Sequence, residues 1–158
     1  PIIKGPYSST NAVAYEMARG GLYIKAHGFW YDYLKRHPAL GELNDLGVPE
    51  PPERVHWDSA YARKVGVPAA YDYGPERIAW LGNLLPNWIG DDGFVRRLMV
   101  RVSRFNLEGD VTWCHGKVVA KWQESGRNLV KCEIWAEDQR GDITARGIAT
   151  VELPSKTA

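Results

Sequence analysis

The chain has 158 residues, of which 44% are hydrophobic and 25% are charged, and its formal net charge is +1. Seven Trp and eight Tyr give it ample apolar surface to bury, which excludes a disordered chain and suits one domain or one repeat of a two-repeat enzyme. The balanced charge excludes a strong chain-wide attraction to nucleic acid or anionic membranes. Since we also find no apolar run near the ~20 residues that span a bilayer and no signal sequence, we expect a cytoplasmic protein.

The first part of the chain, residues 1–92, holds nine of the ten prolines and most of the helical signals. Ile2 and Ile3 predict a short strand, and residues 9–19 predict a helix that is capped by Ser8, Ser9 or Thr10. Residues 29–36 favour a helix, and residues 47–52 favour an extended connector because of their three prolines. A further short helix is expected over residues 58–65, with Asp58 as its N-cap and Gly66 as its end.

One long helix dominates this part of the chain. From Gly74 to Trp88, apolar residues recur at helical spacing, with Ile78, Leu81 and Leu85 between them. Pro75 suits the first turn of a helix, and Glu76 suits the positive end of the helix dipole. We therefore expect a central helix over residues 73–88.

The remaining part, residues 93–153, has the alternating pattern of β-strands. Four long strands are predicted over residues 94–105, 111–122, 128–137 and 143–153, with short turns between them. We expect these strands to form a meander. The fold class is therefore α+β, with an antiparallel sheet wrapped around one long central helix. An open edge of such a sheet is usually covered, so we expect two copies or two related chains to join.

Several segments resemble the MaoC-like hydratases and dehydratases, a family with the hot-dog fold. The segments are residues 56–62, 66–74, 105–110, 116–119, 137–141 and 149–154. The resemblance is closer still to a subgroup of acyl-CoA dehydratase-like proteins, often built with a second hot-dog half. It implies that residues 1–158 form a single MaoC-like hot-dog domain, in which residues 22–54 are a divergent insertion.

Hydration of a trans-2-enoyl thioester needs a base that activates water, an acid that protonates the α-carbon and donors that stabilise the enolate oxygen. In the family, an Asp and a His five residues later handle the protons. The N–H of a glycine at the start of the long helix binds the thioester oxygen. The resemblance implies these roles for His56 and Gly74.

The sequence departs from the family motif at other positions. Pro51 stands where the family has the Asp, and Tyr73 stands where a His commonly precedes the glycine. Glu50, Glu53 or Asp72 could supply a carboxylate instead. Glu53 would meet His56, three residues later, only in a helix, and prolines at positions 51 and 52 argue against one.

The candidate catalytic residues are thus His56, Asp72 and Glu53, and the candidate substrate-binding residues are Gly74, Asp58, Tyr71 and Tyr73. Each also has a structural interpretation. Asp58 and Asp72 could cap helices, Gly74 could permit tight packing, and the tyrosines could be core or interface aromatics. Likewise, Arg96, Arg97, Arg101 and Arg104 could hold a CoA phosphate or form a paired strand face.

The leading hypothesis is an acyl-CoA thioester hydratase or dehydratase of the (R)-specific enoyl-CoA type. It needs no cofactor beyond the acyl-CoA substrate, and no metal-ligand spacing occurs; Cys114 and Cys132 are interpreted as buried thiols. Two alternatives stay open. One is a non-catalytic hot-dog subunit that pairs with a catalytic MaoC-like chain, and the other is an acyl-CoA thioesterase that uses Asp72 or Glu76. The expected partner is a second hot-dog chain in a homodimer or heterodimer, with no nucleic acid and no membrane.

Overall fold

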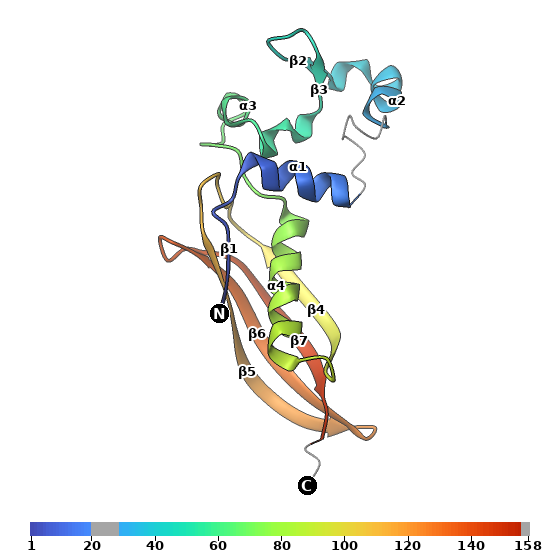
Figure 1. Ribbon diagram of the computed structural model, residues 1–158, viewed down its shortest axis with the longest axis vertical. Helices are drawn as coiled ribbons and strands as arrows, with labels where there is room; N and C mark the ends of the chain where they lie inside the picture. The colour runs from blue at the N-terminus through green and yellow to red at the C-terminus, as the bar shows by residue number, and fades with distance from the viewer. Residues whose placement is uncertain (20–28, 156–158) are drawn as a thin grey trace.

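The computed structural model describes residues 1–19 and 29–155. A sheet of five strands in the order β1-β5-β6-β7-β4 curls around helix α4 (Gly74–Ile89), as Figure 1 shows. Its strands are β1 (Ile2–Lys4), β4 (Phe94–Val102), β5 (Thr112–Glu124), β6 (Arg127–Asp138) and β7 (Ile143–Leu153). Beyond the sheet, around the first residues of α4, lie α1 (Ser9–Ala18), α2 (Phe29–Arg36), the 3₁₀ helices η2 (Pro38–Leu40) and η3 (Pro52–His56), α3 (Ser59–Lys64) and the short strands β2 (Glu42–Leu43) and β3 (Pro49–Glu50).

The core lies between α4 and the concave face of the sheet. Leu81 and Leu85 of α4 are buried against alternate residues of the two central strands, β6 and β7. This alternation confirms the predicted faces, because successive strand residues point to opposite sides of a sheet. The buried strand residues are Val130, Cys132, Ile134, Ala136, Ala145, Ala149 and Val151.

The predicted order of the four strands as a meander is wrong. Only β5, β6 and β7 pair in the order in which they follow one another in the sequence. Strand β4 pairs with β7 and forms one edge of the sheet, while β5 lies on the other side of β6. Residues 103–111 carry the chain across to the other side. The predicted strand over residues 94–105 also ends early, at Val102. Period-2 alternation identifies the face that each strand buries but not the neighbour that it pairs with, which explains the error.

The helix ends follow the predicted capping chemistry. Ser8 is the N-cap of α1 and accepts a hydrogen bond from the Asn11 N–H, and Asp58 caps α3 through the N–H groups of Ala60 and Tyr61. Residues 29–36 form the expected helix. No helix among the described residues is long and apolar enough to cross a membrane.

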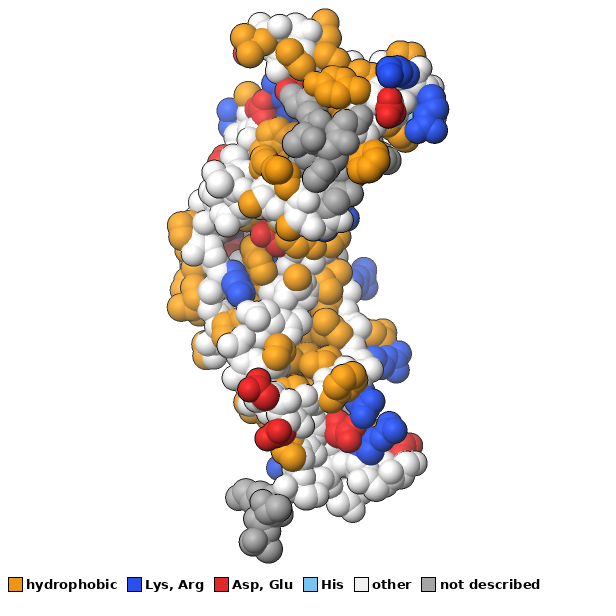
Figure 2. All heavy atoms as spheres, turned by 45° about the vertical axis from the view of Figure 1, so that its right-hand side comes forward, with side chains coloured by type: hydrophobic (Ala, Val, Ile, Leu, Met, Phe, Trp, Pro, Cys, Tyr) orange, Lys and Arg blue, Asp and Glu red, His pale blue; other side chains and the backbone are white. Residues whose placement is uncertain are grey.

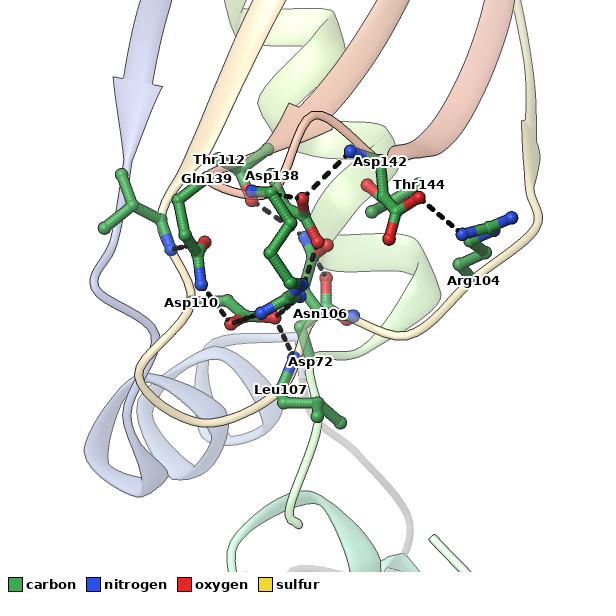
Figure 3. Close-up of polar contacts among 12 residues, drawn as sticks. Asp72, Arg104, Asn106, Leu107, Asp110, Thr112, Asp138, Gln139, Asp142 and Thr144 are labelled. Atoms are coloured by element: carbon green, nitrogen blue, oxygen red, sulfur yellow. Dashed lines mark hydrogen bonds and ion pairs between the residues drawn. The ribbon is translucent and has the colours of Figure 1, made fainter. Parts of the chain in front are cut away.

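A network of charged side chains fixes the crossing segment that precedes β5 (Figure 3). Arg140, in the turn between β6 and β7, donates two hydrogen bonds to Asp110, with N···O distances of 2.8 and 2.7 Å, and also contacts Asp138. Asp110 in turn accepts the Leu107 N–H at 2.8 Å. These contacts hold the chain between β4 and β5 beside the start of α4.

Gly147 of β7 provides a test of the β4–β7 pairing. A Cβ atom there would lie 2.4 Å from the backbone oxygen of Met99 on β4, so the strands would have to separate. We expect Gly147→Ala to lower the free energy of unfolding by about 1–3 kcal/mol, measured by urea denaturation.

Gly116→Ala is the matched control for this prediction. A Cβ atom at Gly116 would meet a side-chain carbon of Leu84 at 3.4 Å, which is close to ordinary contact. Equal unfolding midpoints for the two variants would contradict the strand order described above.

Candidate functional site

The candidate site surrounds the first turn of α4. Gly74 is the first residue of the helix, and its N–H has no acceptor within the helix because it belongs to the first turn. A Cβ atom at Gly74 would meet only Val102, at 3.9 Å, so close packing does not require glycine here. The alternative interpretation of Gly74 as a tight-packing residue is therefore wrong, and this end of the helix carries the positive end of the dipole.

Asp72 anchors the start of α4 and does not cap it. Its carboxylate accepts the Arg77 Nε–H at 2.7 Å and a second bond from Arg77 Nη2, and both side chains are buried. The backbone N–H and the side-chain amide of Asn106 also donate hydrogen bonds to the Asp72 carboxylate (Figure 3). The N-cap position is Tyr73, which makes no side-chain cap, so the interpretation of Asp72 as a cap is wrong.

His56 lies beside this helix start, at the end of η3. Its Nδ1 is 2.7 Å from the backbone oxygen of Tyr71, and its ring stacks on Tyr73 with 3.8 Å between ring centroids. Since a carbonyl oxygen only accepts hydrogen bonds, Nδ1 carries the proton. Burial lowers the pKa of His56 below its ordinary 6.5, so the ring is neutral at pH 7 and Nε2 keeps a lone pair.

Glu53 is in the same 3₁₀ helix as His56. The expectation that the prolines prevent a helix is wrong, because Pro52 occupies the first helical position, where its missing N–H costs nothing. In a 3₁₀ helix, residues three apart lie on the same side, so Glu53 and His56 share one side of η3. Burial raises the pKa of Glu53, and its Oε2 has no partner among the described residues.

Glu16 of α1 and Arg19, the C-cap residue of that helix, also belong to the site, although the sequence analysis does not predict them. Glu16 is fully buried and accepts two hydrogen bonds from Arg19, at 2.6 and 3.1 Å. The Arg19 guanidinium lies 5.7 Å from the centre of the Tyr73 ring. Helical spacing could have identified Glu16, because it is four residues after Ala12 and therefore on the same, buried side of α1.

The buried polar atoms that lack a partner gather around this place. Four such side-chain atoms occur among the described residues. They are Glu53 Oε2, Tyr73 OH, Glu76 Oε2 and Asn106 Oδ1. Buried polar atoms without partners are rare in folded proteins and call for a partner such as water or a ligand.

Glu76 is the most strongly perturbed carboxyl group of this set. It is in the first turn of α4 and its residue is 7% exposed. Burial first, and then the nearby charge of Asp72, raise its pKa to about 7. Burial likewise raises the pKa of the Tyr7 and Tyr73 hydroxyls. Both tyrosines belong to one buried cluster beside the start of α4. The helix start therefore holds a carboxyl group that changes protonation near neutral pH.

The two remaining predicted residues lie at the margin of this site. Tyr71 supplies the carbonyl that holds His56, and its half-buried ring contacts Phe105 with 4.3 Å between centroids. Asp58 is engaged as the cap of α3 and accepts the Arg54 Nε–H at 2.7 Å. The structure thus brings His56, Tyr71, Tyr73 and Gly74 together, with Glu53 beside them, while Asp72 faces Arg77.

A separate pocket of about 350 Å³ lies near the other end of α4. Leu84, Leu85 and Trp88 of the helix and Val118 and Ile134 of the sheet line much of it. Trp88 lies fourteen positions after Gly74, a distance of about 21 Å along the helix axis. No candidate site residue lines this pocket.

Comparison with solved structures identifies the fold. The chain superposes on the (R)-hydratase from A. caviae involved in PHA biosynthesis with a TM-score of 0.68 and 14% sequence identity, over 97% of this chain and 92% of that chain. A MaoC-like dehydratase from Rhodospirillum rubrum matches with a TM-score of 0.59 and 19% identity, over 68% and 77% of the two chains. The HadBC complex from Mycobacterium tuberculosis, a (3R)-hydroxyacyl-ACP dehydratase, matches with a TM-score of 0.59 and 8% identity, over 96% and 90%.

The sequence itself matches no protein-family model and no curated protein. The structural matches confirm the predicted α+β class and the hot-dog fold, the fold of the MaoC-like dehydratases and (R)-hydratases.

The raised pKa of Glu76 predicts how stability depends on pH. The folded chain holds a proton up to about pH 7, whereas the unfolded chain releases it near the ordinary pKa of 4.5. The folded state therefore loses up to about 3 kcal/mol of stability as the pH rises through this interval. We expect Glu76→Gln to remove that loss, so that the variant is more stable than the wild type at pH 8.

Urea denaturation at pH 5 and pH 8 measures the effect of Glu76→Gln. Glu133→Gln, at an exposed position on β6, is the control for loss of a carboxylate. Parallel pH dependence in Glu76→Gln and the wild type would show that Glu76 keeps an ordinary pKa.

Proposed function

We propose that this chain binds acyl-CoA thioesters and catalyses hydration of a trans-2-enoyl thioester, with dehydration of the (R)-3-hydroxyacyl thioester as the reverse reaction. The observation that carries the proposal is the gathering of a neutral His56, the first-turn N–H of Gly74 and four unpartnered buried polar atoms at one helix start. The shared fold of an (R)-hydratase and of MaoC-like dehydratases supports it.

In this proposal, each group has a definite step. The thioester oxygen accepts the Gly74 N–H, and the positive end of α4 stabilises the enolate. His56 Nε2 takes a proton from water as the water oxygen bonds to C3. Burial raises the pKa of Glu53, which increases the fraction of its carboxyl group that carries a proton, and this form gives the proton to C2. Transfer of the proton from His56 to Glu53 then restores both groups.

The other candidate residues support these steps. The Tyr73 hydroxyl, which has no partner among the described residues, donates to the water or to the thioester. The Tyr71 carbonyl holds the His56 tautomer. Both oxygens of Asp72 are occupied by Arg77 and Asn106, so we assign Asp72 a positioning role for α4. The substrate contact predicted for Asp58 stays a prediction.

A non-catalytic role within a pair of hot-dog chains is the second candidate. The position of the family's Asp is Pro51, whose side chain is fully buried. The edge of β4 and the outer half of β5 also have no neighbouring strand among the described residues. The HadBC complex, which shares the fold, supports an assembly of two such chains.

Hydration of crotonyl-CoA and longer enoyl-CoAs tests the first candidate. We expect His56→Ala to reduce turnover at least ~100-fold, which is the usual contribution of a general base. Turnover should also fall as His56 is protonated, at a pH below its ordinary pKa of 6.5.

His37→Ala, at an exposed histidine, is the matched control and should keep full activity. Release of the CoA thiol from saturated acyl-CoA would instead indicate hydrolysis. Absence of hydration in the wild type, alone and with a partner chain, would refute the proposed reaction.

Mixing the chain with a MaoC-like chain that carries an intact Asp-x-Asn-Pro-x-His motif tests the second candidate. If this chain is a non-catalytic subunit, light scattering should detect a heteromer whose hydratase activity survives His56→Ala here. A homodimer that is active alone and inactive as His56→Ala would exclude that role.

A further inference from the structure

The face of the sheet that points away from α4, which we call the outer face, is strongly basic. Three rows of side chains cross it, starting from Arg97, Met99 and Arg101 of β4. The strand pairings place Lys131 in the row of Arg97, Lys117 and Glu133 in the row of Met99, and Arg146 in the row of Arg101. Glu133 is the one carboxylate in these rows. These three rows carry five cations and one carboxylate. Beyond the rows, the outer face also carries Glu137 and Glu152, and Glu152 pairs with Arg96.

The five cations of the three rows form no close ion pairs, although Lys117 is the cross-strand neighbour of Glu133. Among the described residues, none of the five forms an ion pair, whereas Arg96 and Arg104 of the same segment pair with Glu152 and Asp142. Figure 2 shows basic side chains along one edge of the molecule, with acidic side chains beside the lowest of them.

One pair of cations is directly opposed. Arg101 is the cross-strand neighbour of Arg146, and like charges in that position destabilise a sheet. The contact would become favourable if an anionic surface covered both guanidinium groups.

The centre of the outer face is apolar. Met99 and Ile148 are cross-strand neighbours, with 52% and 43% exposure. The Trp135 ring lies in the next row, beside Arg146, and stacks on His115 with 5.1 Å between centroids. An exposed apolar centre within charged groups, rich in Arg, Met and Trp, is the composition of protein–protein interfaces.

We propose that the outer face binds an acidic protein partner, whose carboxylates meet Arg97, Arg101 and Arg146 and whose apolar residues meet Met99 and Ile148. A second copy of this chain does not fit, because two basic faces would repel each other. Nucleic acid would use the cations but leave the apolar centre uncovered. This inference does not depend on the proposed enzymatic function, since the outer face lies on the other side of the sheet from Gly74.

Binding of purified apo-acyl carrier protein, a small acidic helical protein, tests the proposal by calorimetry at low ionic strength. We expect measurable binding that weakens with added salt. Arg101→Glu combined with Arg146→Glu should weaken it at least tenfold, and Met99→Ser should weaken it severalfold. Arg63→Glu, at an exposed position on α3, is the matched charge control and should bind like the wild type.

The single variant Arg101→Glu separates binding from folding. It replaces two opposed cations by an ion pair, so it should raise the melting temperature while it weakens binding. Absence of binding in the wild type, or binding unchanged by the double variant, would overturn the proposal. Tighter binding to a DNA oligonucleotide or to phosphatidylglycerol vesicles through the same arginines would overturn it as well.

Discussion

The buried ion pair between Asp72 and Arg77 is the contact on which the site depends. Arg77 also donates to the backbone oxygens of Thr144, at 3.0 Å, and Arg104, so one guanidinium joins the start of α4 to the end of β4 and the start of β7. Removal of either partner would leave a buried charge alone, which costs about 3–5 kcal/mol. The position of Gly74 relative to the sheet therefore follows from this pair.

The same anchor determines where the crossing segment runs. Asn106 contacts Asp72 and Thr112, and Leu107 forms an isolated bridge with Tyr71. Because Tyr71 also supplies the carbonyl that orients His56, the imidazole is tied to the start of α4 by way of the backbone. Sheet, helix and imidazole thus form one connected unit, in which a shift of residues 103–111 would move the imidazole of His56.

The sequence predicts elements and faces better than it predicts neighbours. Alternation identified the buried sides of β6 and β7, and the capping roles of Ser8 and Asp58 followed from local chemistry. The pairing of β4 with β7 joins residues far apart in the sequence, such as Met99 and Ile148, and no local pattern encodes it. The resemblance indicated His56 and Gly74, yet Glu16 and Arg19 come from a helix distant in sequence.

Pro51 stands where the family that the sequence resembles has an Asp, so another residue has to supply the carboxyl group that the reaction needs. Pro51 cannot supply a carboxylate, whereas the carboxyl groups present here, Glu53 and Glu76, have pKa values that burial raises. Protonated carboxyls suit the donation of a proton to carbon better than the activation of water. In the proposed reaction, the base is therefore the neutral imidazole of His56, and the acid is the carboxyl group of Glu53, whose pKa burial raises. The proposed reaction thus places both proton-transfer groups, His56 and Glu53, in the single 3₁₀ helix η3.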